Sequence, residues 1–183
     1  MRIIAGRLRG RPITAPTGRK LRPTADRIRE AVFNILDHGL GRDAPTIENA
    51  RVLDGFAGTG AMGLEALSRG AGQATFMDID VAPCRYNVKT LGEMAQSEVI
   101  RADCLYPPPA IRPANMVFLD PPYNENCAME ALLALNQAGW IAMNAICVIE
   151  SDAREEIIQA QEFRLLDNRR YGMGTIKFFC RED

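Results

Sequence analysis

Short apolar segments that end at an acidic residue alternate with helical segments along most of this chain, and this alternation limits the fold most strongly. The pattern predicts seven strands, most of them separated by helices, and the last two, at 163–171 and 174–180, form a hairpin. Strands separated by helices build βαβ units, which give a parallel sheet covered on both faces. The predicted fold class is therefore α/β, with a mostly parallel seven-stranded sheet, helices on both faces and a C-terminal antiparallel hairpin.

The remaining elements follow from periodicity and from helix start and stop signals. The other five strands are expected at 51–56, 73–77, 97–101, 115–119 and 145–149. One helix runs from a cap at Thr24 to about Asp37, and another is capped by Asn126 and ends at Ala138. Further helices are expected at 61–69, 82–92 and 152–160.

Acidic residues stand at the ends of five predicted strands. They are Asp54, Asp78, Asp103, Asp120 and Glu150. Ligands of open α/β sheets bind beyond the carboxyl ends of the strands, near the point where strand order reverses. One such residue is commonly a cap or a turn residue, but four aspartates at four successive strand ends are hard to explain by packing alone.

A glycine-rich turn follows the first strand of the sheet. Gly58, Gly60 and Gly63 match the dinucleotide fingerprint, and Asp78 follows as the expected acid, so a nicotinamide cofactor is one interpretation. The other is S-adenosyl-L-methionine, whose cationic methionine end would face Asp54 while its ribose hydroxyls bind Asp78. A pyrophosphate beside Asp54 would be repelled, so the turn favours S-adenosylmethionine, and a purely structural turn is the third possibility.

The tetrapeptide Asp120-Pro121-Pro122-Tyr123 directly follows another apolar strand. Two prolines fix the backbone and remove two N–H donors, which leaves the Asp120 carboxylate and the Pro121 carbonyl as rigid acceptors. An exocyclic NH₂ group needs such acceptors, and Tyr123 can stack on a planar base or amide. Methyl transfer is an in-line displacement, so positioning the nitrogen is a large part of the catalysis. The element therefore favours methylation of an amino group, with a simple proline turn as the alternative.

The basic residues gather at the amino terminus. Residues 1–29 hold nine basic side chains and one acid, although the whole chain has a net charge of −1. This distribution favours a polyanionic partner over a merely solvated tail. The basic residues are Arg2, Arg7, Arg9, Arg11, Arg19, Lys20, Arg22, Arg27 and Arg29. We divide the chain into a basic arm with its helix (1–40) and a main domain (41–183).

Other classes of protein are disfavoured. The five cysteines are widely spaced and the chain has one histidine, His38, so no metal site is predicted. Such cysteines are typical of reduced, buried thiols in a reducing compartment. No apolar run reaches a membrane span or a signal peptide, so we expect a cytoplasmic protein without a membrane partner.

These motifs, together with the amino-terminal sequence, resemble one family of class I methyltransferases. The stretches Met1–Gly6, Leu21–Glu30, Phe33–Leu36, Gly63–Ala71 and Arg170–Gly172 resemble the bacterial RsmD family of small-subunit rRNA guanine-N2 methyltransferases. The resemblance covers nearly the whole chain and implies a Rossmann-like class I methyltransferase fold. Gly55, Asp78 and the proline-rich residues 106–109 depart from the family pattern.

The resemblance implies transfer of methyl from S-adenosyl-L-methionine to N2 of one guanine in 16S rRNA, within the small ribosomal subunit or its assembly intermediate. The implied catalytic residues are Asp120, Pro121, Pro122 and Tyr123. The implied cofactor-binding residues are Asp54, Phe56, Gly58, Gly60, Asp78, Ile79, Asp103, Cys104, Thr24 and Arg27. The arginines expected to bind RNA are Arg7, Arg9, Arg11, Arg22 and Arg27. Methylation of adenine N6 in DNA or of a protein glutamine amide is the alternative, followed by an NAD-dependent oxidoreductase and a non-catalytic RNA-binding protein.

Overall fold

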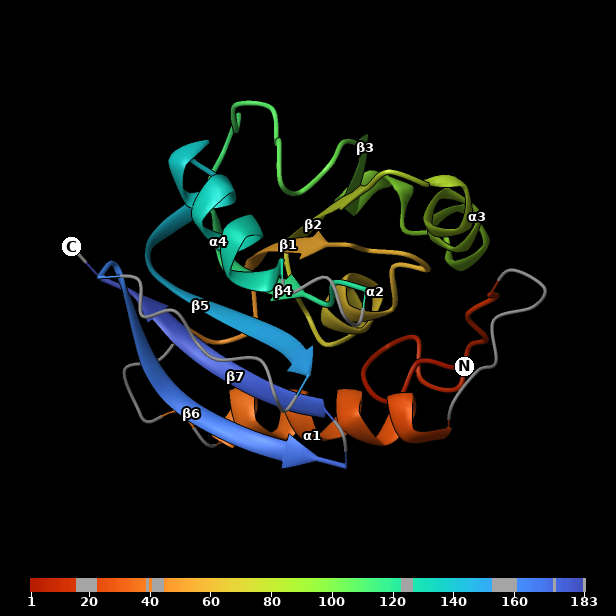
Figure 1. Cartoon of the computed structure of the whole chain (residues 1–183). Helices are drawn as coiled ribbons and strands as arrows, with labels where there is room; N and C mark the ends of the chain where they lie inside the picture. Colours follow the sequence, from red (N-terminus) through yellow and green to blue (C-terminus); the bar gives the residue numbers. More distant parts are fainter. Residues whose placement is uncertain are drawn as a thin grey trace.

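Seven strands form a single sheet in the order β3-β2-β1-β4-β5-β7-β6 (Figure 1). The computed structural model describes residues 1–15, 23–38, 40, 45–122, 127–152, 161–172 and 174–182. The strands are β1 (Arg51–Gly55), β2 (Gln73–Asp78), β3 (Ser97–Arg101), β4 (Ala114–Leu119), β5 (Ile141–Asp152), β6 (Phe163–Tyr171) and β7 (Gly174–Arg181). The helices are α1 (Pro23–His38), α2 (Ala61–Ser68), α3 (Ala82–Leu91) and α4 (Ala128–Gln137), with a short 3-10 helix η1 (Met94–Gln96).

The seven predicted strands and the C-terminal hairpin are confirmed. Strands β1 to β5 pair in parallel, whereas β7 runs antiparallel between β5 and β6. Strand β5 is longer than expected, because it also includes residues 141–144 and 150–152. Its register against β4 shifts between Ile141 and Ile146, where Asn144 has a φ of 59°. The periodicity of residues 145–149 reports only the regular part of this strand.

Two helix starts differ from the prediction. Helix α1 begins at Pro23, so Thr24 lies inside its first turn and does not cap it. Proline is favoured in that turn because its missing N–H is not needed there. Helix α4 begins at Ala128 with Cys127 in the capping position, and the predicted cap Asn126 lies outside the described residues. The predicted last helix falls on residues 153–160, also outside the described part, and Asp152 belongs to β5.

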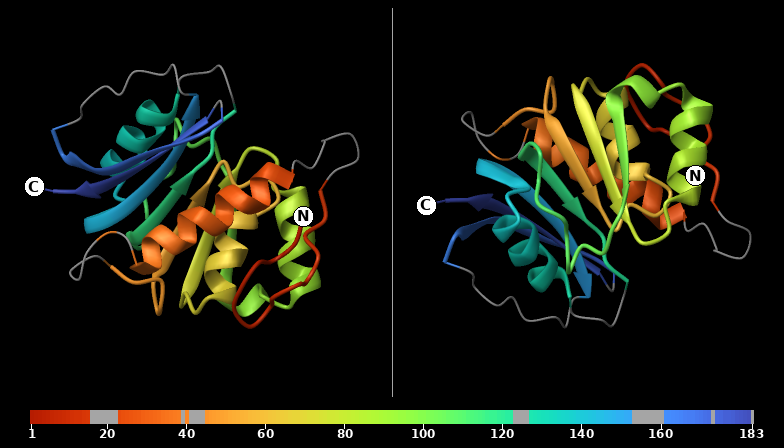
Figure 2. Two further views of the ribbon diagram at one scale, coloured as in Figure 1. Left: turned by 90° about the horizontal axis from the view of Figure 1, so that it is seen from below. Right: turned by 90° about the horizontal axis from the view of Figure 1, so that it is seen from above.

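The two faces of the sheet bury two separate apolar clusters. Strand residues such as Val52 and Phe76 face α1, α2 and α3, whereas their neighbours Leu53 and Met77 face α4. This alternation is the two-residue period of β-strands. Seen from below, α1 crosses the strands on the first of these faces (Figure 2). The sheet is therefore covered on both faces, as expected for parallel strands.

The amino-terminal segment (residues 1–15) packs onto the first cluster. Its backbone folds back on itself, with a bridge between Arg2 and Pro12, and it buries Ile3, Leu8 and Ile13. The division of the chain at residue 40 remains a prediction, but this segment shares its core with the sheet. Among the described residues, no helix has the length and apolarity of a membrane span.

Candidate active site

The chain reverses its direction across the sheet between β1 and β4. From β1 it continues outward through β2 and β3 and then returns to β4 on the other side of β1. Gly55, the last residue of β1, pairs with Met77 in β2 and with Leu119 in β4. The carboxyl ends of these three strands therefore meet at the switch point, where open α/β sheets bind their ligands.

The backbone between β1 and α2 forms a tightly held glycine turn (residues 56–60). The Ala57 N–H donates to the Met77 carbonyl at 3.1 Å, and the Gly58 N–H donates to Asp78 Oδ2 at 2.7 Å. Gly58 and Gly60 have φ values of 53° and 77°, and Phe56 has 55°. A left-handed conformation at a phenylalanine is strained, and such strain concentrates at functional sites.

Two glycines of the fingerprint serve packing. A Cβ atom on Gly63 would lie 2.4 Å from Cε1 of Phe76, and one on Gly60 would lie 2.9 Å from Sγ of Cys84. Both glycines let the start of α2 lie directly against β2 and α3. The glycine spacing therefore reports close helix–strand packing and does not by itself indicate a pyrophosphate.

Asp54 is a buried carboxyl group at the centre of this corner. Only 3% of it is exposed, and its Oδ2 accepts a hydrogen bond from the Gly63 N–H at 2.8 Å. The pKa of Asp54 is raised to about 8, mainly by burial and to a smaller extent by the charges of Asp120 and Asp78. The Gly63 hydrogen bond and the charge of Arg29 act in the opposite direction. Burial disfavours the ionised form of this carboxyl group, and a cation bound beside it would stabilise that form.

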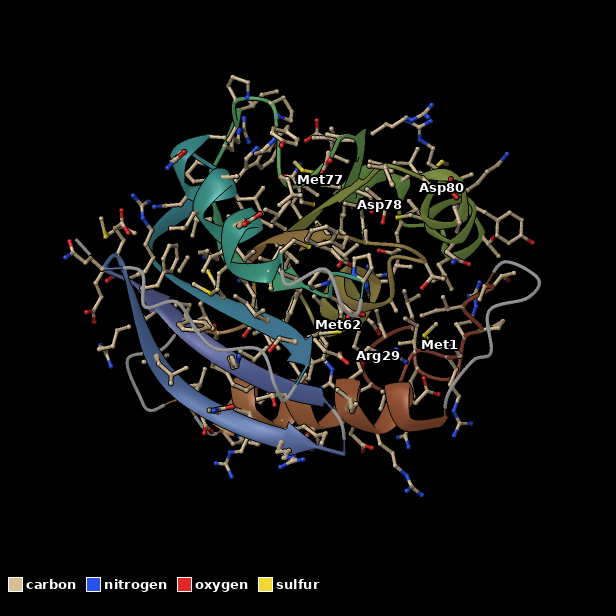
Figure 3. The ribbon with its side chains drawn as sticks, in the orientation of Figure 1. Met1, Arg29, Met62, Met77, Asp78 and Asp80 are labelled. Carbon is tan, nitrogen blue, oxygen red and sulfur yellow. The ribbon has the colours of Figure 1, made fainter. Side chains whose placement is uncertain are left out.

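The other predicted cofactor residues surround the same turn. Asp78 Oδ1 accepts from the Asp80 N–H at 2.9 Å (Figure 3). Ile79 between these two residues is exposed. Each Asp78 oxygen keeps a second lone pair for a ligand hydroxyl. Asp103 and Cys104 follow β3, where Asp103 Oδ1 accepts from the Leu105 N–H at 2.9 Å.

Cys104 is buried, and its sulfur accepts from the Phe56 N–H at 3.3 Å. Burial raises the pKa of Cys104 to about 12, so its thiol stays neutral and is a poor nucleophile. All five cysteines are free thiols, and four of them are buried, as expected from their spacing.

The predicted acceptor element begins directly after β4. Asp120 and Pro122 are exposed, while Pro121 between them is buried. Asp120 lies close enough to Asp54 for its charge to raise the pKa of that carboxyl group. Tyr123 lies outside the described residues.

The arginines predicted to bind RNA or cofactor have different surroundings. The guanidinium of Arg7 pairs with Glu93 and also donates to Gln96 Oε1 at 3.0 Å, and the side chain of Arg11 donates to the Thr90 carbonyl at 3.3 Å. Arg9 and Arg27 are exposed. Arg22 and the side chain of Thr24 lie outside the described residues.

Comparison with known proteins gives consistent results. The model of the family described as Conserved hypothetical protein 95 matches residues 1–180. Ribosomal RNA small subunit methyltransferase D of Haemophilus influenzae is 35% identical over 186 residues, which cover 98% of this chain and 93% of that protein. The protein of the same name from Escherichia coli K12 is 39% identical over 155 residues, 83% of this chain and 75% of that protein. This chain belongs to the RsmD family.

The fold of this RsmD-family chain is shared as well. The solved structure of the Escherichia coli protein yhhF matches it with a TM-score of 0.85 and 34% identity, covering 100% of this chain and 98% of that one. The chain thus has the Rossmann-like fold of class I methyltransferases. At Gly55, a Cβ would lie 2.6 Å from Cδ2 of Leu119, so the leucine fills that space.

Sequence reasoning missed a buried ionic network beneath the site of this RsmD-family chain. Glu65 of α2 is fully buried, and its carboxylate accepts from the backbone N–H groups of Ile4 and Ala5 at 2.8 and 3.0 Å and from Arg69 Nε at 2.9 Å. Arg29 Nη2 donates to the Arg2 carbonyl at 2.6 Å, and its Nε lies 3.6 Å from Glu65 Oε2.

Arg29 was expected to add to the basic surface, and this expectation is wrong because only 3% of the residue is exposed. It lies on α1, and its guanidinium is directed toward the Arg2 carbonyl of the amino-terminal segment and toward Glu65 of α2 (Figure 3). The signal in the sequence was a single acid, Glu65, within the otherwise apolar run of α2. The network ties α1, α2 and the amino-terminal segment together below the glycine turn.

A cavity of about 290 Å³ lies at the opposite end of the strands, where their amino ends meet. Its lining includes Arg51, Gln73 and Ala114, the first residues of β1, β2 and β4, together with Trp140. The glycine turn and Asp120 instead lie at the carboxyl ends of these strands. We place the candidate active site there, because the switch point gathers three aspartates and the strained backbone of Phe56. The carboxyl group in the lining of the cavity is that of Glu98, beside Arg51 and Arg112.

Proposed function

We propose that this chain transfers a methyl group from S-adenosyl-L-methionine to the exocyclic N2 of a guanine in 16S rRNA. The observation that carries the proposal is the meeting of Asp54, Asp78 and Asp120 at the carboxyl ends of three neighbouring strands, beside the glycine turn. The relatives named Ribosomal RNA small subunit methyltransferase D support an RNA substrate from the small subunit or its assembly intermediate.

The carboxyl groups of the site fit this cofactor. Asp54 sits behind the turn in a position that favours a cation, and Asp78 presents acceptors for vicinal ribose hydroxyls. A pyrophosphate at the same turn would face three carboxyl groups without a cation between them, which argues against a nicotinamide dinucleotide. Phe56, Ile79, Asp103 and Cys104 would complete the walls of the site around the adenine and ribose.

Bound S-adenosylmethionine supplies an electrophilic methyl group on a cationic sulfur. The Asp120 carboxylate and the Pro121 carbonyl would accept hydrogen bonds from the guanine amino group, which leaves the nitrogen lone pair directed toward the methyl carbon. Holding nitrogen and methyl about 3 Å apart in line removes much of the entropic barrier. Asp120 also stabilises the positive charge that grows on the nitrogen during transfer.

The basic residues near the amino terminus would guide the RNA. Arg9 and Arg27 are exposed and can meet phosphates, and Arg7 and Arg11 would first have to leave their partners on and near α3. The enzyme would act in the cytoplasm, where its RNA substrate is assembled.

The test is a radiolabelled methyl-transfer assay on small subunits from cells that lack the enzyme, followed by digestion of the rRNA to nucleosides. We expect label in N2-methylguanosine. Label in another nucleoside would assign a different acceptor atom, and no label in RNA, with S-adenosylmethionine still bound, would direct the search to DNA or protein amides. Absence of S-adenosylmethionine binding would overturn the cofactor assignment itself.

A further inference from the structure

We propose that Asn87 of α3 is a positioning residue that joins the amino-terminal segment to the glycine turn and thereby sets the affinity for the cofactor. Its side-chain Oδ1 accepts from the Thr14 N–H at 2.9 Å, and its Nδ2 donates to the Thr14 carbonyl, also at 2.9 Å. The same Nδ2 donates to the carbonyl of Thr59 at 3.0 Å. One side chain therefore holds two segments that lie 45 residues apart.

The chemistry of this contact requires an amide. Asn87 is 1% exposed, so each of its polar atoms must find a partner within the protein. A side-chain amide has one acceptor atom and two donor hydrogens, and here the acceptor and both donors are used. A carboxylate of the same shape has no hydrogen to donate, and an apolar side chain would leave the buried Thr59 carbonyl without a partner.

The contact with Thr59 completes the anchoring of the glycine turn. On the β2 side, Ala57 and Gly58 donate to Met77 and Asp78. On the α3 side, the Asn87 amide fixes the carbonyl of Thr59, directly before Gly60, where α2 begins. Without it, this peptide is held only by the Gly60 N–H, which donates to the Ala57 carbonyl at 2.7 Å. The loss of one of the two anchors makes it easier for Gly58 to shift relative to Asp78, the residue that would bind ribose.

The same residue couples two binding events. The amino-terminal segment is bonded to α1, because Arg29 of that helix donates to the Arg2 carbonyl at 2.6 Å. The same helix carries the exposed Arg27 that is proposed to meet RNA. The docking of Thr14 and the placement of Thr59 depend on the one amide of Asn87. RNA bound to α1 and cofactor bound at the turn would therefore both favour the conformation in which Asn87 makes these hydrogen bonds. Such coupling is reciprocal: whatever steadies the segment tightens cofactor binding, and cofactor steadies the segment. This inference rests on the proposed cofactor.

The first test compares Asn87→Asp with the matched control Asn115→Asp. Asn115 lies at the other end of the sheet, where its Oδ1 accepts from the Arg51 N–H, and an aspartate there keeps that bond. For Asn87→Asp we expect S-adenosylhomocysteine to bind about tenfold more weakly by titration calorimetry, because a buried donor is lost. The KM for S-adenosylmethionine should rise by a similar factor while kcat stays within about twofold.

A residue with a merely structural role would lower the amount of active enzyme, and hence kcat, without moving KM. The control should leave both the affinity and the KM within about twofold of the wild type. An unchanged affinity in folded Asn87→Asp, or an equal loss in the control, overturns the proposal.

The second test uses amide hydrogen exchange and does not depend on the cofactor. In Asn87→Asp, the Thr14 amide and the amides of the glycine turn should exchange faster together, because both lose a shared anchor. Faster exchange in the amino-terminal segment with an unchanged turn would show that the two are independent and would contradict the proposal. If Asn87→Asp does not fold, Thr14→Pro replaces it: it removes one donor to Asn87, and faster exchange of the turn is again the expected result.

Failure of the proposed function appears differently. If the wild-type protein binds no S-adenosylhomocysteine, the cofactor assignment is wrong, yet the exchange measurement still decides whether Asn87 links the two segments. If the wild type binds it, added S-adenosylhomocysteine should slow exchange of the Thr14 amide. An unaltered rate at Thr14, with slower exchange in the turn, would contradict the coupling alone.

Discussion

The glycine turn and the residues after β4 meet at the same corner of the sheet, but the fold holds them differently. The turn is bonded to β2 on one side and to α3 on the other, and Asp54 behind it is buried. Asp120 and Pro122, at the end of β4, are exposed to solvent. The proposed cofactor side is thus formed by packing, while the proposed acceptor side exposes Asp120 to solvent, where a substrate could reach it.

This contrast suggests a division of labour. The groups proposed to bind the cofactor are positioned by helices, strands and a buried ionic network, so changes there should alter affinity and stability. Asp120, which is proposed to receive the substrate amino group, is exposed, so a change there should alter the reaction more than the stability. Each prediction below tests one side of this comparison against the other.

The largest effect is expected on the acceptor side. Asp120→Ala removes the carboxylate that would accept from the amino group and balance its growing charge, and we expect methyl transfer to fall by about a thousandfold. Binding of S-adenosylhomocysteine should stay within about threefold, because the glycine turn is untouched. The control is Glu98→Gln, which removes a carboxylate on β3. Residual turnover within about tenfold of the wild type would disprove the role of Asp120.

The next effect concerns the stability of the cofactor side. Glu65→Ala takes one of two carboxylates from the buried Arg29, which keeps Asp26 at 2.9 Å, and removes the partner of Arg69 Nε. It also deprives the Ile4 and Ala5 N–H groups of their acceptor. Breaking a buried ion pair from one side costs about 3–5 kcal/mol, so the free energy of unfolding in urea should fall by that amount. The exposed Glu48→Ala serves as the control. A loss below about 1 kcal/mol, as for a surface pair, would show that the network does not hold the amino-terminal segment.

A further effect on the stability of the cofactor side is expected from pH. The pKa of Asp54 is raised to about 8, so the folded protein binds a proton that the unfolded chain releases from about pH 4 upward. The free energy of unfolding of the protein without cofactor should therefore fall as the pH rises from about 4 to about 8. Asp54→Asn should flatten this slope in urea titrations at several pH values.

The same carboxyl group should make cofactor affinity depend on pH. A bound cation favours the ionised form of Asp54, so S-adenosylmethionine should bind more tightly as the pH rises toward about 8 and level off above it. An identical pH profile in Asp54→Asn would mean that another group is responsible.

The smallest effect is expected from single arginines. Arg9 is exposed, and Arg9→Gln should lower the slope of RNA affinity against salt by about one and weaken binding modestly. Arg7→Gln should change the slope less, because the guanidinium of Arg7 is paired with Glu93 and Gln96. Equal slopes for both variants and the wild type would show that this part of the chain does not touch phosphate.

The sequence predicted the parts of the molecule that repeat with a local period. The strands ending at Asp54, Asp78 and Asp120 follow from apolar runs and from the rule that binding residues stand at strand ends. The helix that covers residues 61–69 was recognisable from its glycine stop. Tyr123 and most of the predicted last helix remain predictions, because they lie outside the described residues.

The parts that depend on distant neighbours could not be predicted. Arg29 looks like any other arginine of a basic arm, and only tertiary packing places it against Glu65. Asn87 is a polar residue on a helix, and nothing local tells that Thr14 and Thr59 lie on either side of it. The sequence alone therefore predicts one basic surface at the amino terminus, although one of these residues, Arg29, is buried and stabilises the fold.

A crystal structure with bound S-adenosylhomocysteine tests the central assignment most directly. We expect its amino-acid end at the glycine turn near Asp54, its ribose hydroxyls on Asp78, and its sulfur facing Asp120 and Pro121. The account would be contradicted if the ligand occupied the cavity lined by Arg51 and Trp140, at the amino ends of the strands, and left the glycine turn empty.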